Sequence, residues 1–267
     1  RYSIQISNPR LHAVEVAAHV HAHGHDVHLG ASRPRLRAHP DRLGHALISS
    51  IRSALSSIAT TADPGSCSLV TVAEGRFFSN GLDTAWVGTS LTRLNSLIAA
   101  FRLIAADLLA LPMPTVAAVT GHASAAGLIL ALCHDTRLMR AGADRGVVLY
   151  MSEVDIGVLP PPGYFMAVLP AKIPCARALR DVVLRGRKVR AHEAKEMGVV
   201  DVVCPGAAET AAEAMKLAER LAAREWDGGV YSARRISLYP DACRAVGIVV
   251  KEESDGEMVK NFASSRI

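Results

Sequence analysis

The chain has 267 residues, of which 50% are hydrophobic, with a formal net charge of +5 and an isoelectric point near 9.1. A chain of this size and composition can bury a full core as one large domain or as a domain with an appendage, which excludes a disordered protein. The basic residues are scattered and aromatic residues make up only 4%, so we expect mild attraction for an anionic small ligand and no nucleic-acid partner.

Cysteine spacing and the apolar stretches limit the remaining classes. The five cysteines include no Cys-x-x-Cys pair, which favours reduced thiols inside a cell over disulfides or a zinc site. Asp107, Pro112, Pro114 and His122 interrupt the most apolar region, residues 103–133. We therefore expect no membrane span, which needs about 18 uninterrupted apolar residues.

Residues 1–40 differ from the rest of the chain, since they carry seven of the eleven histidines and show no clear apolar face. The alternation of His19, His21, His23 and His25 would place four imidazoles on one side of a strand, where they could hold a transition metal. No cysteine completes a ligand set there. We favour a solvated, poorly ordered arm and predict no metal site.

From Leu43 onward the pattern alternates between helix and strand. Apolar residues at helical spacing predict helices at 43–58, 91–111, about 126–133 and 207–224, with further helix after that. Short apolar runs predict strands in "CSLVTVAEG", "TVAAVTG", "TRLMR", "VVLYM" and "GVVDVV". This alternation predicts an α/β core.

Two strand-to-helix junctions are built from small residues: "GRFFSNGLD" (Gly75–Asp83) and "GHASAAG" (Gly121–Gly127). Small side chains at such turns allow a ligand to approach main-chain N–H groups. If the two loops face one another, the amides of Leu82 and Ala126 point at a single carbonyl oxygen and form an oxyanion hole, aided by the positive end of the helix that begins near Ala126. Each loop taken singly fits close strand–helix packing equally well.

Other small-residue motifs are excluded. Ser124 lacks the flanking glycines of a G-x-S-x-G nucleophile elbow, and neither a dinucleotide-binding nor a P-loop glycine pattern occurs. His122 and His134 fit hydrogen-bonded positions near the core better than catalytic ones.

A carbonyl held in an oxyanion hole acidifies its α-hydrogens, so the remaining need is a base. Glu153 follows an apolar strand and has Val154 and Ile156 beyond it, surroundings that raise the pKa of a carboxylate and suit it to proton transfer. Asp155 would share the same face in an extended chain, so spacing does not choose between the two.

The ordered motifs together resemble the enoyl-CoA hydratase/isomerase, or crotonase, superfamily. The two loops, "SEVDIG" and "LRGRKVRAHEAKEMGVVDVV" carry the resemblance over about residues 42–245, and three stretches look closest to its plant peroxisomal isomerases. The resemblance implies a crotonase-like spiral of ββα units at 41–203 and a helical trimerisation region at 204–267. It also implies acyl-CoA substrates, homotrimers or hexamers, and no metal or redox cofactor.

Carried over by position, Leu82 and Ala126 supply the oxyanion-hole amides. The residues that match substrate-binding positions are Ser79, Asn80, Gly81, Leu82, Asp83, Ala126 and Gly127. Family hydratases use two glutamates, and here the first position is Ile129 whereas the second is Glu153. The resemblance therefore implies isomerisation of a 3-enoyl-CoA to the trans-2-enoyl-CoA by a single glutamate. The alternatives are hydration, another crotonase-type activity, or a catalytically weak acyl-CoA-binding subunit.

The two ends of the chain carry separate expectations. The last residues, Ser265-Arg266-Ile267, resemble a peroxisomal address, which implies an import receptor as partner and a peroxisomal location. At the other end the family has a short apolar β-hairpin, and we expect the histidine-rich residues 1–40 to have replaced it.

Overall fold

The computed structural model of the chain describes residues 2–7, 41–61, 64–142, 146–157 and 161–250. The histidine alternation at 19–25 and the C-terminal tripeptide 265–267 lie outside these residues, so their predicted roles stay predictions. Within the described ranges, no helix combines the length and the apolar character that crossing a bilayer requires.

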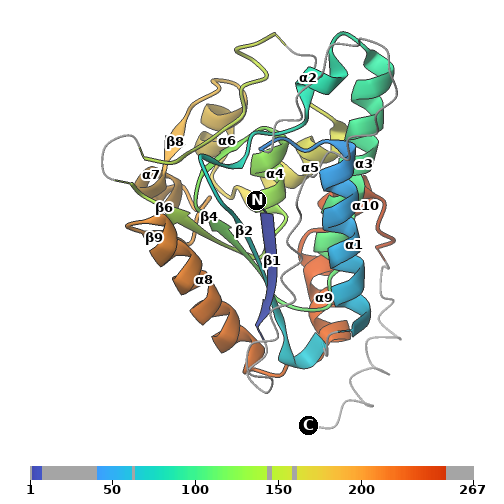
Figure 1. Ribbon diagram of the computed structural model, residues 1–267, viewed down its shortest axis with the longest axis vertical. Coiled ribbons are helices and arrows are strands. Elements are labelled where there is room, and N and C mark those ends of the chain that lie inside the picture. The colour runs from blue at the N-terminus through green and yellow to red at the C-terminus, as the bar shows by residue number, and fades with distance from the viewer. Residues whose placement is uncertain (1, 8–40, 62–63, 143–145, 158–160, 251–267) are drawn as a thin grey trace, which may run out of the picture.

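A five-stranded sheet forms the larger layer, in the order β1-β2-β4-β6-β9 (Figure 1). Its strands are β1 Tyr2–Ser7, β2 Ser68–Ala73, β4 Thr115–Val119, β6 Thr136–Arg140 and β9 Val202–Cys204. All neighbours in this sheet run parallel except β1, which pairs antiparallel with β2.

A second sheet has the order β3-β5-β7-β8 and contains β3 Phe77–Ser79, β5 His122–Ser124, β7 Val148–Tyr150 and β8 Val189–Arg190. Successive strands alternate between the sheets: β2, β4 and β6 of the first are followed by β3, β5 and β7 of the second, and each pair is followed by helix. The predicted succession of ββα units is confirmed.

The helices occupy the segments that helical spacing predicts and several more. They are α1 His45–Thr61, α2 Thr84–Val87, α3 Leu91–Ala110, α4 Ala126–Leu132, α5 Gly163–Lys172, α6 Ala176–Val183, α7 Ala191–Glu196, α8 Ala207–Ala222, α9 Gly228–Leu238 and α10 Pro240–Val246, with a 3₁₀ turn at Pro64–Ser66. The helix α3 begins where the Ser90 hydroxyl accepts a hydrogen bond from the Arg93 N–H, and it ends before Pro112.

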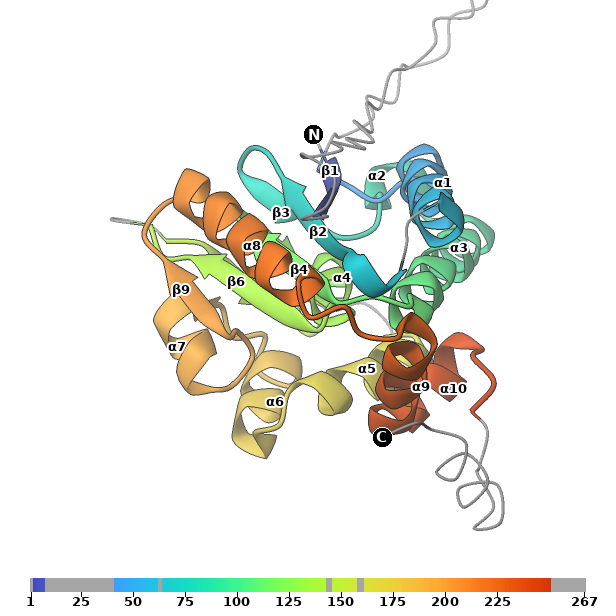
Figure 2. The same cartoon turned by 90° about the horizontal axis from the view of Figure 1, so that it is seen from below.

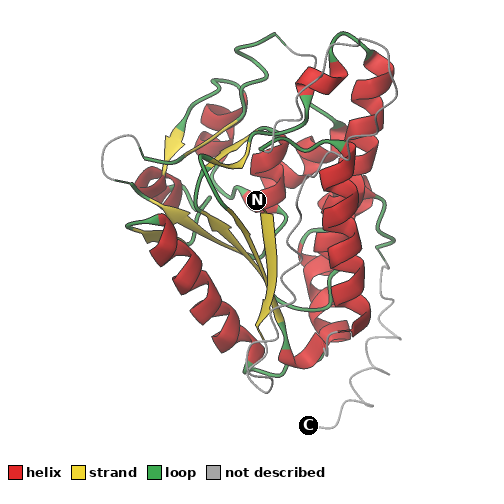
Figure 3. Cartoon of the chain, in the orientation of Figure 1, coloured by secondary structure: helices red, strands yellow, loops and turns green. Residues whose placement is uncertain are grey.

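The larger sheet is covered on both faces (Figures 2 and 3). On one face Val70, Val116 and Leu138 pack against α8 through Ala214 and Ala218. On the other face the alternate strand positions join the main core with α1, α3 and α4. The period-two alternation along each strand therefore supplies two separate apolar layers.

The expectation that residues 1–40 lack a core strand is wrong for residues 2–7. These residues form β1 and pair with β2 over the register Tyr2↔Ala73 to Ser7↔Ser68. Ile4 is buried in the main core. The first strand of the sheet is therefore present, and the histidine-rich segment follows it.

Candidate active site

A cavity of about 250 Å³ lies where the carboxyl ends of β3, β5 and β7 face helices α3 and α5. The residues after these three strands form one side of the cavity, and apolar helix residues form the other. Its lining consists of Arg42, Asn80, Leu82, Thr84, Leu94, Ile98, Ser124, Ala125, Ala126, Tyr150, Ser152, Glu153, Ile156, Pro161, Pro162 and Phe165. Both small-residue loops thus contribute to one site.

The loop after β3 presents the N–H of Leu82 to this cavity. Leu43 donates to the carbonyl of Gly81 at 2.8 Å and accepts from the N–H of Asp83 at 3.2 Å, which makes a parallel bridge. In such a bridge the N–H of the middle residue, here Leu82, points away from Leu43. Among the described residues the Leu82 N–H donates no hydrogen bond.

The second loop brings the N–H of Ala126 to the same place. Ala126 is the first residue of α4, so its N–H has no acceptor within the helix. A Cβ atom added to Gly81 would lie only 3.5 Å from the Ala126 nitrogen, which shows that the two loops are in contact. The two amides that the sequence pattern singles out therefore line one cavity.

Ala125 holds an unusual backbone conformation between these groups. Its φ of 50° and ψ of −121° are values that L side chains rarely adopt, and its own N–H donates to the carbonyl of Tyr150 at 3.0 Å. Because ψ of Ala125 sets the direction of the next peptide group, this strain orients the Ala126 N–H.

Glu153 is the only carboxylate among the described residues that line the cavity. Its Oε2 atom is buried and has no hydrogen-bond partner among the described residues. Burial raises the pKa of the carboxyl, and hydrogen bonds from the main chain at Glu153 and Ser152 only partly oppose this effect. A buried carboxylate oxygen without a partner is ready to take a proton from a bound ligand.

The structure separates Glu153 from Asp155. The strand β7 ends at Tyr150, earlier than the sequence indicates, and residues 153–157 form a turn. Asp155 is consequently exposed and outside the cavity lining. Val154 and Ile156 are 53% and 65% exposed, and of the two only Ile156 lines the cavity with Glu153, so Val154 does not supply the apolar surroundings that the sequence suggests.

The other predicted binding residues divide into two groups. Asn80 lines the cavity with Leu82 and Ala126, whereas Ser79, Gly81, Asp83 and Gly127 are not in its lining. The Ser79 hydroxyl accepts from the Gly81 N–H at 3.3 Å, and the Asp83 carboxylate accepts from the Trp86 N–H at 3.3 Å and caps α2. These two side chains hold the loop in shape.

Gly127 allows α4 to approach β3 closely. A Cβ atom at this position would lie 2.3 Å from the carbonyl oxygen of Ser79 and 2.7 Å from its Cβ atom. Gly127 therefore serves close strand–helix packing, and that packing brings the two loops together at the cavity.

His122 in the second loop and His134 after α4 both make structural hydrogen bonds. His134 is fully buried between the carbonyl of Leu130 at 2.9 Å and the hydroxyl of Thr71 at 2.8 Å, and burial lowers its pKa to about 4. His122 accepts a hydrogen bond from the Val148 N–H at 3.1 Å. Neither lines the cavity, as the sequence analysis predicts.

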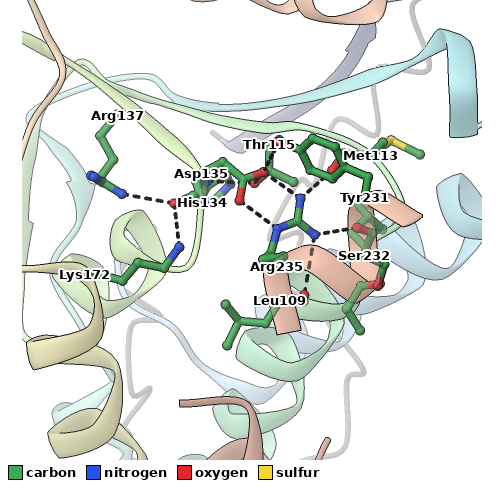
Figure 4. Close-up of polar contacts among 12 residues, drawn as sticks. Leu109, Met113, Thr115, His134, Asp135, Arg137, Lys172, Tyr231, Ser232 and Arg235 are labelled. Carbon is green, nitrogen blue, oxygen red and sulfur yellow. Dashed lines mark hydrogen bonds and ion pairs between the residues drawn. The ribbon is translucent and has the colours of Figure 1, made fainter. Parts of the chain in front are cut away.

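A buried ion pair joins α9 to the start of β6, away from the cavity (Figure 4). Asp135 accepts from Arg235 Nε at 2.7 Å and Nη2 at 2.6 Å, and Arg235 also donates to the carbonyl of Met113 at 2.6 Å. Burial pushes the pKa of Asp135 upward, but the hydrogen bonds and charge of Arg235 hold it below its ordinary value. This cluster holds the C-terminal helices against the sheet. The hydrophobic periodicity of the sequence does not reveal the ion pair.

The chain belongs to the enoyl-CoA hydratase/isomerase family, whose sequence model matches residues 42–227. It is 46% identical over 219 residues to enoyl-CoA delta isomerase 2, peroxisomal, of Arabidopsis thaliana, with 79% of this chain and 87% of that protein covered. It is 43% identical over 223 residues to enoyl-CoA delta isomerase 1, peroxisomal, of the same plant, covering 84% and 90%. The predicted family is therefore confirmed.

A solved structure of similar fold is the enoyl-CoA hydratase EchA3 of Mycobacterium ulcerans, with a TM-score of 0.69 and 21% identity over 77% of this chain and 86% of that one. This likeness confirms the crotonase-like α/β fold.

Proposed function

We propose that the protein is an enoyl-CoA delta isomerase that converts 3-cis- or 3-trans-enoyl-CoA to trans-2-enoyl-CoA in the β-oxidation of unsaturated fatty acids. The observation that carries the proposal is the meeting, in one cavity, of the Leu82 and Ala126 amides with the Glu153 carboxylate, whose buried Oε2 atom has no hydrogen-bond partner among the described residues. The names of the Arabidopsis relatives support the same activity.

In the proposed mechanism the thioester oxygen accepts hydrogen bonds from the Leu82 and Ala126 N–H groups. Glu153 removes a proton from C2, the C2–H electron pair forms a C1–C2 double bond, and the carbonyl π pair moves onto the thioester oxygen, giving a dienolate whose negative oxygen the two amides stabilise. The protonated Glu153 then returns the proton at C4: the C=O bond re-forms, the C1–C2 pair becomes the C2–C3 double bond, and the C3–C4 π pair makes the new C4–H bond. Atoms and charge balance without any redox change, so we propose no metal or redox cofactor, with coenzyme A entering as part of the substrate.

A single carboxylate favours isomerisation over hydration. Ile129 occupies the position of the first hydratase glutamate, is fully buried in α4 and does not line the cavity. Since Glu153 is the only carboxylate in the described lining, the site offers one group that can shuttle a proton but no second acid that would position water. Hydration, another crotonase-type activity and a catalytically weak acyl-CoA-binding role remain the alternatives that the experiment below tests.

We also propose that the protein assembles as a homotrimer, or as a hexamer of two trimers, and works in the peroxisome. Exposed Val230 and Leu238 on α9 flank a hollow of about 480 Å³ beside Trp226 and Tyr231, an apolar surface suited to contact with another copy. The peroxisomal names of two relatives support the location, and an import receptor would bind the C-terminal tripeptide.

The decisive experiment follows the ultraviolet absorbance of the conjugated trans-2-enoyl thioester during incubation with a cis-3-enoyl-CoA. We expect conjugation by the wild-type protein and its loss in Glu153→Gln, which keeps the size of the side chain, while calorimetry shows that the variant still binds the saturated acyl-CoA. Asp155→Asn is the matched control and should retain activity, because Asp155 lies outside the cavity. A folded wild-type protein that binds acyl-CoA without forming the conjugated product would refute the isomerase proposal.

A further inference from the structure

The cavity has two chemically different ends. Arg42, Asn80 and Thr84 form a polar end, where Arg42 donates to the Thr84 hydroxyl. Leu94 and Ile98 of α3 and Phe165 of α5 form an apolar end. If the two loops hold the thioester oxygen, the polar group offers contacts for the polar arm of an acyl-CoA and the apolar group offers contacts for its acyl chain.

Phe165 lines the apolar end and is held there by its neighbours. Its side chain is only 3% exposed, and it packs edge-on against two other rings: Tyr164, with centroids 4.9 Å apart, and Phe101, with centroids 5.8 Å apart. Phe101 is fully buried and is not itself part of the cavity lining, so it lies behind Phe165 as a second layer. Edge-on aromatic packing restricts the movement of the ring.

A hydrogen bond fixes the wall to the opposite helix. The Tyr164 hydroxyl donates to the carbonyl of Ile98 at 2.9 Å, which ties the start of α5 to α3 at a residue that also lines the cavity. The two helices that bound the apolar end therefore cannot separate without breaking this bond and the aromatic cluster. These contacts hold Phe165 in place against the cavity.

We propose that Phe165 is the specificity-determining residue that limits acyl-chain length, so that the enzyme prefers short 3-enoyl chains to long ones. The inference rests on the proposed function, because it assumes that the acyl chain occupies the apolar end of the cavity. Ile156 also lines the cavity and is 65% exposed, so it lies on the side that faces solvent. A long acyl chain would leave past Ile156 if Phe165 did not limit the chain length.

The test compares trans-3-hexenoyl-CoA with trans-3-dodecenoyl-CoA as substrates of the wild-type protein, Phe165→Ala and Phe165→Leu. Phe165→Leu removes less of the side chain, so it still tests the proposal if Phe165→Ala fails to fold. Phe101→Leu is the matched control, since it removes a ring from the same cluster but not from the wall. We expect the kcat/KM ratio of dodecenoyl to hexenoyl substrate to rise by about tenfold or more in the folded Phe165 variants. Each newly accommodated methylene contributes about fourfold, which corresponds to about 0.8 kcal/mol. Phe101→Leu should change the ratio by less than about threefold.

A second measurement separates this proposal from the proposed function. Hexanoyl-CoA and dodecanoyl-CoA have no double bond to move, so their affinities, measured by calorimetry, do not depend on turnover. A shift of affinity toward dodecanoyl-CoA in the Phe165 variants would support the proposal that Phe165 limits acyl-chain length, even if no isomerisation occurred. Unchanged length preference in these variants, or an equal shift in Phe101→Leu, would overturn it.

Discussion

Replacing Gly127 by alanine tests whether the close approach of α4 to β3 creates the proposed oxyanion hole. The added Cβ atom would lie 2.3 Å from the main-chain oxygen of Ser79. Ordinary contacts begin near 3.4 Å, so α4 and the loop after β3 must separate by about 1 Å. The obstacle is backbone rather than the end of a flexible side chain, and it cannot turn away.

Two effects of known size follow from that displacement. Overpacking a tight interior contact costs about 1–3 kcal/mol of unfolding free energy. Misplacing a catalytic group by about 1 Å, or removing one oxyanion-hole donor, lowers kcat by roughly 100-fold or more. We therefore expect Gly127→Ala to remain folded but destabilised, with isomerase kcat reduced by about 100-fold.

The assay combines thermal unfolding with conjugated-product formation from a cis-3-enoyl-CoA. Gly163→Ala is the matched control: a Cβ atom there would meet nothing within 4 Å, and the residue begins α5 without lining the cavity. If Gly127→Ala keeps kcat within about threefold of the wild type at an unchanged Tm, the close approach of the loops is not what makes the site.

Two further predictions concern the strained residue and the base. Ala125→Gly should relieve the positive φ and raise Tm by about 2–4 °C, for a gain of about 1 kcal/mol, and a lower Tm in differential scanning calorimetry would contradict the strain argument. In the proposed mechanism Glu153 acts in its ionised form, and burial raises its pKa, so kcat/KM should fall on acidification at a higher pH than the value of about 4.3 for an ordinary glutamate. A pH–rate profile that stays flat down to that value would contradict this assignment.

The parts of the fold that the sequence predicts are those with a clear local pattern. Helix α1 buries every third to fourth residue, so periodicity reveals it, whereas strands β2 and β4 are buried on both faces and are revealed by continuous apolar runs. The helix α5 is different: it is apolar on most sides and contains Pro170, so neither period nor composition marks it. Strand β8 has only two residues, which is too short for any pattern.

The same distinction explains the limits of site prediction. Loop composition indicates the Leu82 and Ala126 amides, because small residues beside a turn have a local cause. Glu153 can be distinguished from Asp155 only when the turn at 153–157 is known. The spacing of residues along an extended chain does not reveal this turn. Phe165 reaches the cavity only through the packing of α5 on α3, a contact between segments 60 or more residues apart in sequence.

A site built from main-chain donors places its sequence requirements beside the donors and not on them. Leu82 and Ala126 would act through their N–H groups, so several side chains at these positions would leave those groups in place. The requirement falls instead on Gly127, where any side chain separates the loops. Only Glu153 must keep its own functional group. It follows that losing the chemistry by substitution takes either this one carboxylate or a residue that never touches the substrate.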